Sequence, residues 1–68
     1  MKIFSERLQQ LRIEANLTQS QLAEALNTTQ RRISYLEKEK VEPDLHTLFA
    51  IARFFDVSAD YLIGLKDY

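Results

Sequence analysis

Helix start signals recur at short intervals along this chain, and they restrict its fold more than any other feature. In the segment Leu17-Thr18-Gln19-Ser20-Gln21-Leu22, Thr18 can cap the backbone of Gln21 while the Gln21 side chain reaches back, which makes a capping box. Leu17 and Leu22 on either side can form the hydrophobic staple that accompanies it. The chain therefore predicts several short helices, because further start signals are Thr29, Asp44 after Pro43, and Ser58 after Val57.

Apolar side chains are spaced at helical intervals throughout, and no stretch alternates as a half-buried strand would. The spacing predicts helices over about 4–15, 18–26 and 29–38, a fourth after Asp44 and a short fifth after Ser58. The expected fold class is therefore all-α, a compact bundle of five helices. The side chains expected to face inward are Phe4, Leu8, Leu11, Ala15, Leu22, Ala23, Leu26, Ile33, Leu36, Leu45, Leu48, Phe49, Ala52, Phe55 and Leu62.

The connections between these helices are only a few residues long, and the chain has a single glycine. A helix end often needs a residue in the left-handed conformation, which Asn and Asp adopt more readily than other non-glycine residues. Asn16, Asn27 and Asp56 stand where such residues are needed. Because the second and third helices are joined only through Asn27 and Thr28, residues 18–38 are a helix-turn-helix candidate.

Size and composition exclude several classes of protein. A chain of 68 residues is one domain at most, which we take as 1–68. It has no Cys and one His, His46, so neither a disulfide nor a metal site is expected. With no glycine-rich phosphate loop, we expect no cofactor and no enzyme activity. No apolar run approaches the ~20 residues of a membrane span and no signal peptide is evident, which favours a cytoplasmic protein.

The charge of the chain is unevenly distributed, although its net value is only −1. Residues 1–27 carry three basic and three acidic side chains, so they are neutral. Residues 28–40 carry four basic and two acidic side chains, a net charge of +2, and residues 41–68 carry two and five, a net charge of −3. The positive charge therefore coincides with the third predicted helix, and its distribution matters more for nucleic-acid binding than the total.

The segment TQSQLAEALNTTQRRISYLEKEKVEPDLHTLFAIARFFDVSADYLIG resembles the helix-turn-helix family of phage repressors and Cro proteins, the xenobiotic-response-element-type regulators. The shared features are the Thr-Gln start, Leu-Ala in the second helix, a polar third helix closed by Glu, a Pro before the fourth helix and Val-Ser before the fifth. The resemblance covers about residues 5–65 without a gap, with the family core at about 8–62. It implies a lambda-repressor-like DNA-binding domain whose third helix, 29–38, enters the major groove of double-stranded DNA.

The third helix separates its polar and apolar side chains. On a wheel of about 100° per residue, Ile33 and Leu36 lie opposite an arc of polar donors and one tyrosine. An isolated Arg pair is more often an ordinary solvated surface, but its place on the third helix of this pattern favours DNA contact. The side chains expected to read bases are Gln30, Arg31, Ser34 and Tyr35, and those expected to bind phosphates are Thr18, Gln19, Thr29, Arg32, Lys38 and Lys40.

Two features after and within the third helix bear on that expectation. Many family members have Gly where this chain has Glu39, so either the loop tolerates a strained residue or the helix runs longer. Glu39 and Glu42 also repel phosphate wherever they approach it.

The resemblance further implies that Arg12 and Glu37 form a structural ion pair where the first and third helices cross; the alternative is two separate surface charges.

Two function classes remain at this point. The first is a sequence-specific DNA-binding transcriptional regulator, expected to be a repressor of nucleoid-associated, bacterial or phage type, acting as a homodimer on a palindromic operator. Candidate dimer contacts are Phe54, Tyr61 and Ile63, although single exposed aromatic residues are common. The second is a protein-interaction module of the same fold, such as an antitoxin-like partner. The acidic residues 41–68 favour it, and the polar donors of the third helix disfavour it.

Overall fold

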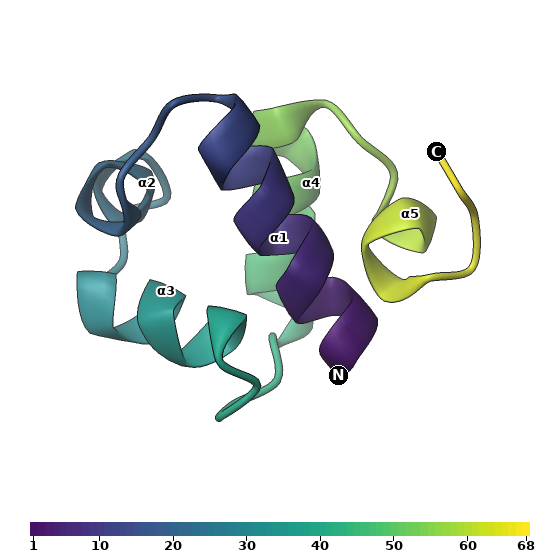
Figure 1. Ribbon diagram of the computed structural model, residues 1–68, viewed down its shortest axis with the longest axis horizontal. Helices are drawn as coiled ribbons and strands as arrows, with labels where there is room; N and C mark the ends of the chain where they lie inside the picture. Colours follow the sequence, from purple (N-terminus) through teal and green to yellow (C-terminus); the bar gives the residue numbers. More distant parts are fainter.

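The computed structural model describes residues 1–68 and contains five helices and no strand. The helices are α1 (Lys2–Glu14), α2 (Gln19–Ala25), α3 (Gln30–Glu37), α4 (Leu45–Phe55) and α5 (Ala59–Ile63). Figure 1 shows α1 crossing the molecule diagonally in front of α4, with α2 and α3 on one side and α5 on the other. The five-helix expectation is confirmed. None of these helices has both the length and the apolar character needed to cross a membrane.

Each of the last four helices is capped by the residue that the sequence predicted, and begins at the next residue. The Thr18 hydroxyl accepts a hydrogen bond from the backbone N–H of Gln21 at 3.0 Å, and the backbone N–H of Thr18 donates to Gln21 Oε1 at 2.8 Å, which completes the capping box. The side chains of Thr29, Asp44 and Ser58 cap the other three helices in the same way. These bonds satisfy N–H groups that have no partner within the helix.

The short connections depend on residues in the left-handed conformation, as predicted. Asn16 and Asn27 have φ of 59° and Asp56 has φ of 55°. Glu39 has φ of 62° and so adopts the strained alternative, while α3 ends at Glu37. The backbone N–H of Lys40 donates to Tyr35 O at 2.9 Å, which closes the helix end in the manner of a Schellman motif. This geometry is normally given to Gly, because a side chain there costs roughly 1–2 kcal/mol.

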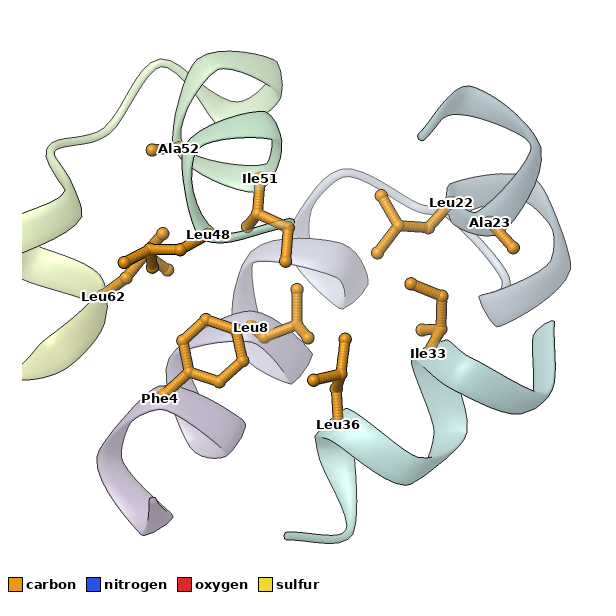
Figure 2. Packing of buried hydrophobic residues seen from close by; sticks show 10 residues of the cluster. All are labelled: Phe4, Leu8, Leu22, Ala23, Ile33, Leu36, Leu48, Ile51, Ala52 and Leu62. Carbon is orange, nitrogen blue, oxygen red and sulfur yellow. The ribbon is translucent and has the colours of Figure 1, made fainter. Parts of the chain in front are cut away.

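All five helices contribute to one hydrophobic core (Figure 2). Ile33 and Leu36 project from α3 toward Leu22 of α2 and Leu8 of α1 in this view. Leu11 and Leu26, also expected in the core, are half-buried and pack against it. The buried apolar residues are Phe4, Leu8, Leu22, Ala23, Ile33, Leu36, Leu48, Ile51, Ala52 and Leu62.

Three inward assignments were wrong. Leu45 and Phe49 are 70% and 54% exposed, whereas Ile51, which was not assigned to the core, is fully buried. Only three residues of α4 are polar, so more than one face of this helix has a helical apolar pattern, and packing against its neighbours selects the one that includes Ile51. Ala15 is also exposed, because it lies at the C-terminal cap of α1 rather than on its buried face.

Candidate nucleic-acid interface

The polar face of α3 is oriented by its packing against α2. Leu22 and Ala23 of α2 are buried together with Ile33 of α3 (Figure 2). The connection is tightened by the left-handed Asn27 and by the backbone N–H of Thr28, which donates to Ala23 O at 2.9 Å. Because the apolar side of α3 is held in the core, its opposite side faces solvent as one continuous surface.

That surface, which we call the α3 polar face, consists of Gln30, Arg31, Ser34, Tyr35 and Lys38. Gln30, Arg31 and Lys38 are exposed, and Ser34 and Tyr35 are half-buried. Arg31 Nε donates to the Tyr35 hydroxyl at 3.1 Å, and the Arg31 guanidinium carbon lies 5.3 Å from the centre of the Tyr35 ring. The structure thus brings the predicted base-reading residues together, with the Arg31 fork held against an aromatic ring.

A chain of hydrogen bonds leads from this face into the protein interior. Gln30 Nε2 donates to Gln19 Oε1 at 2.7 Å, and Gln19 Nε2 donates to Glu37 Oε1 at 3.0 Å. Gln19 was predicted to bind phosphate, but its link to Gln30 was not foreseen. Nothing in the local sequence indicates that link, because the two residues are 11 positions apart on different helices.

The inner end of the chain is a buried ion pair, which confirms the predicted pairing of Arg12 and Glu37. Arg12 Nε donates to Glu37 Oε2 at 2.7 Å and Arg12 Nη2 to Glu37 Oε1 at 3.1 Å, a two-pronged geometry. The side chains are 13% and 3% exposed. The hydrogen bond to Glu37 raises the pKa of Arg12, helped by the charge of the carboxylate and opposed by burial. Arg12 Nη1 also donates to Leu17 O at 2.8 Å, so one side chain joins α1, α3 and the segment before α2.

The residues predicted to bind phosphates fall into two groups. Lys38 and Lys40 are exposed and make no ion pair within the chain. Arg32 is half-buried, and its Nη2 lies 3.9 Å from Asp44 Oδ2 and 3.5 Å from Thr47 Oγ1. Its charge is therefore already partly compensated, which sequence reasoning did not indicate. The Thr18 and Thr29 hydroxyls accept the capping bonds, and each keeps a proton to donate.

The acidic residues beside this surface are exposed as well. Glu39 and Glu42 are both exposed, and Glu42 Oε1 lies 3.6 Å from the N-terminal ammonium of Met1. The Met1 ammonium thus offsets part of the Glu42 charge, whereas Glu39 has no such partner. Of these two exposed carboxylates, Glu39 is the one without an ion-pair partner within the chain.

The three predicted dimer contacts differ in accessibility. Phe54 is 44% exposed and packs edge-on against Phe55. Tyr61 is half-buried beneath the Arg7 guanidinium, whose carbon lies 4.2 Å from the ring centre, and Ile63 is half-buried and packs against the core. Arg7 also donates to the backbone oxygens of Tyr61 and Lys66, so it anchors α5 to α1.

Comparison with known proteins places this geometry in context. A family model described as helix-turn-helix matches residues 8–62. The HTH-type transcriptional activator BcrR of Enterococcus faecalis is 47% identical over 61 residues, which cover 90% of this chain and 30% of that protein. The HTH-type transcriptional regulator YobD of Bacillus subtilis is 40% identical over 65 residues, covering 96% of this chain and 58% of that protein. The chain thus spans between about a third and three fifths of these two relatives.

The fold is also that of a solved repressor. The P22 c2 repressor, determined in complex with a synthetic operator, superposes with a TM-score of 0.84 at 26% identity, covering 91% of this chain and 94% of that one. The lambda-repressor-like fold class that was expected from the sequence is thereby confirmed.

Proposed function

Because this chain belongs to the helix-turn-helix family, we propose that it is a sequence-specific DNA-binding transcriptional regulator that places α3 in the major groove. The observation that carries the proposal is the α3 polar face, which is fixed outward by Ile33 and Leu36, both fully buried. The likeness to a repressor bound to its operator supports the same docking. As a regulator of this class the protein acts in the cytoplasm, on the nucleoid.

Gln30 and Arg31 are the proposed base readers, and their hydrogen bonds leave the necessary groups free. A Gln amide pairs with adenine through one oxygen and one N–H. Gln30 donates only one N–H of its side-chain amide to Gln19, so the second N–H and the amide oxygen remain free to bind a base. Arg31 uses Nε on Tyr35 and keeps both terminal nitrogens for guanine O6 and N7. Ser34 and Tyr35 lie one turn further on, where we expect them to contact bases, a thymine methyl or a phosphate.

Among the proposed phosphate contacts, Lys38 and Lys40 should contribute the most to the free energy of DNA binding, because neither makes an ion pair within the chain. Arg32 must exchange part of its contact with Asp44 for a phosphate, so we expect a smaller gain from it. Gln19, Thr18 and Thr29 add neutral donors at the starts of α2 and α3. Such contacts set the register on DNA without reading its sequence.

The experiment that tests these roles compares Arg31→Ala with Lys40→Ala. Selected sites and single-base variants of them are titrated at several salt concentrations. Arg31→Ala should remove about 1–3 kcal/mol of discrimination at one G·C position. Lys40→Ala should leave the preferred sequence unchanged, weaken all sequences alike and lower the salt slope by about one unit. Equal weakening of every sequence by Arg31→Ala would show that Arg31 binds a phosphate instead.

We further propose that the protein binds as a homodimer to a palindromic operator, with half-sites about one helical turn apart. Repression is the expected sense of regulation. A reporter that carries the selected site upstream or downstream of the promoter start distinguishes repression from activation.

A protein-interaction module remains the second candidate function. The observations that favour it are the acidic residues 41–68 and the exposed Leu45 and Phe49 of α4. It takes first place if neither Arg31→Ala nor Lys40→Ala changes binding to any duplex.

A further inference from the structure

Tyr35 makes a contact on the α3 polar face that differs from those of the other tyrosines. All three tyrosine rings of the chain have a cationic side chain nearby, and the partners are Arg31 for Tyr35, Arg7 for Tyr61 and Lys66 for Tyr68. Only Tyr35 also accepts a hydrogen bond on its hydroxyl, from Arg31 Nε at 3.1 Å. The Arg31 guanidinium is therefore contacted at two points, by the ring and by the hydroxyl.

Tyr35 is the stiffer partner in this contact. Its ring turns about only two side-chain dihedrals and is half-buried, whereas Arg31 is exposed and its longer side chain has more rotamers. The Tyr35 backbone is held by the closure of α3, because its carbonyl oxygen accepts from the backbone N–H of Lys40 at 2.9 Å. Arg31 and Tyr35 are four positions apart on one helix, so the contact forms within α3 itself. Tyr35 therefore restrains Arg31 rather than the reverse.

The contact decides which atoms of Arg31 are available to a base. A guanidinium can present either Nε with one terminal nitrogen or both terminal nitrogens as a fork. With Nε bound to Tyr35, the terminal pair is the fork that remains, and it matches O6 and N7 of guanine. The Tyr35 hydroxyl has used an acceptor site and keeps its proton, so it can still donate to a phosphate oxygen.

We infer that Tyr35 is a positioning residue, which acts through Arg31 and strengthens the preference of the protein for guanine at one base pair of its site. The inference rests on the proposed function, in which Arg31 reads a base, and it gives Tyr35 a role other than reading a base of its own. An Arg side chain that is already ordered loses less freedom on binding. The same restraint prevents Arg31 from adjusting to the acceptors of a different base, so discrimination increases.

Binding of Tyr35→Phe to a panel of duplexes tests the inference. The panel consists of the selected site and its single-base variants, measured at one salt concentration. Arg31→Ala identifies the base pair that Arg31 reads through a loss of discrimination of roughly 5- to 150-fold. Tyr35→Phe keeps the ring but removes the hydrogen bond, so it should lose about threefold to tenfold at the same base pair. Added to Arg31→Ala, it should cause no further loss there, because the two residues act as one unit.

Tyr68→Phe is the matched control, because it removes a phenol hydroxyl from a tyrosine outside α3, and it should leave every base preference unchanged. If Tyr35→Phe changes the preference at another base pair and not at that of Arg31, Tyr35 reads a base directly and the inference is wrong. Loss of discrimination in Arg31→Ala but not in Tyr35→Phe would overturn the inference and leave the proposed function intact. If neither variant alters binding to any duplex, the proposed base reading by α3 fails as well.

A measurement without DNA tests the contact itself. NMR spectra resolve the Nε–H groups of arginine side chains, and the rate at which each proton exchanges with water reports its hydrogen bonding. The Arg31 Nε–H should exchange at least threefold more slowly than that of Arg53, which is exposed and makes no ion pair. In Tyr35→Phe the two rates should become similar. Equal rates in the wild-type protein would overturn the inference, whatever the duplex panel shows.

Discussion

Helix α3 makes two Arg–carboxylate pairs, and their difference shows how placement decides what a charge does. The pair of Arg12 and Glu37 has side-chain exposures of 13% and 3% and a shortest contact of 2.7 Å. The pair of Arg32 and Asp44 has exposures of 38% and 66% and a contact of 3.9 Å. The first pair has little contact with solvent, and its charges are compensated by their hydrogen bonds to each other and to neighbouring groups. The second keeps its water, so solvent and salt weaken it.

The two pairs therefore serve different purposes on one helix. The buried pair joins α3 to α1, and through Gln19 it is also linked to the Gln30 amide on the α3 polar face. The exposed pair leaves a basic side chain, Arg32, accessible to solvent at the edge of that surface and only partly compensated by Asp44. A buried ion pair does not necessarily add stability, because removing two charges from water is costly. The main contribution of the Arg12–Glu37 pair is to orient α3 relative to α1.

Breaking the buried pair on one side should have the largest effect. Arg12→Met leaves the Glu37 carboxylate buried with only the Gln19 amide, so we expect a loss of about 3–5 kcal/mol in the free energy of unfolding. Urea unfolding at neutral pH measures the loss. Arg32→Met is the matched control and should cost much less. Similar losses in the two variants would mean that burial does not distinguish these pairs.

Replacing both partners should recover most of that loss. In Arg12→Met/Glu37→Leu no buried charge is orphaned, so the free energy of unfolding should return to within about 1 kcal/mol of the wild-type value or exceed it. The preference for one base should nevertheless weaken, because Gln19 loses its acceptor and Gln30 is no longer held. A double variant that is stable and fully discriminating would show that the chain of hydrogen bonds does not position Gln30.

Interrupting the chain at Gln19 should produce a smaller change in stability. Gln19→Ala removes the hydrogen bonds to Glu37 and Gln30 but leaves the Arg12–Glu37 pair intact, so about 1 kcal/mol of stability should be lost. Discrimination at the base read by Gln30 should decrease. Gln21→Ala is a useful comparison, since it removes a Gln from the same helix but only affects the α2 cap. If both variants discriminate equally well, Gln19 has no positioning role.

Asp44, the acidic partner of the exposed pair and also the cap of α4, should make the stability of the protein depend on pH. Hydrogen bonds from the Thr47 side chain, and then from its backbone, hold the pKa of Asp44 below its ordinary value of 3.8, and the charge of Arg32 contributes less. The ionised cap therefore stabilises the fold above about pH 4, and this stabilisation is lost as the pH falls through the lowered pKa. Asp44→Asn keeps a cap but does not titrate. Melting temperatures at pH 2–7 should show a smaller acid-induced decrease in Asp44→Asn; identical profiles would contradict this role.

The sequence by itself determined the features that depend on a few neighbouring residues. The caps at Thr18, Thr29, Asp44 and Ser58 each join a side chain to a backbone N–H three positions later, so the partners are visible in the sequence. The left-handed turns at Asn16, Asn27 and Asp56 depend on the type of one residue. The segregation of polar and apolar side chains on α3 follows from helical periodicity alone. These local rules predicted the five helices and the membership of the α3 polar face.

Only the tertiary structure decided which of several locally acceptable arrangements was adopted. The predominantly apolar α4 offers more than one inward face, and packing with the other helices buried Ile51 and exposed Leu45 and Phe49. The link from Gln30 through Gln19 to Glu37 joins two helices across a turn, and Arg32 meets Asp44 across the loop after α3. At Glu39, the closing bonds of α3 outweighed the strain of a left-handed side chain. Each outcome depends on the simultaneous packing of several elements, which no periodicity or motif in a single segment can contain.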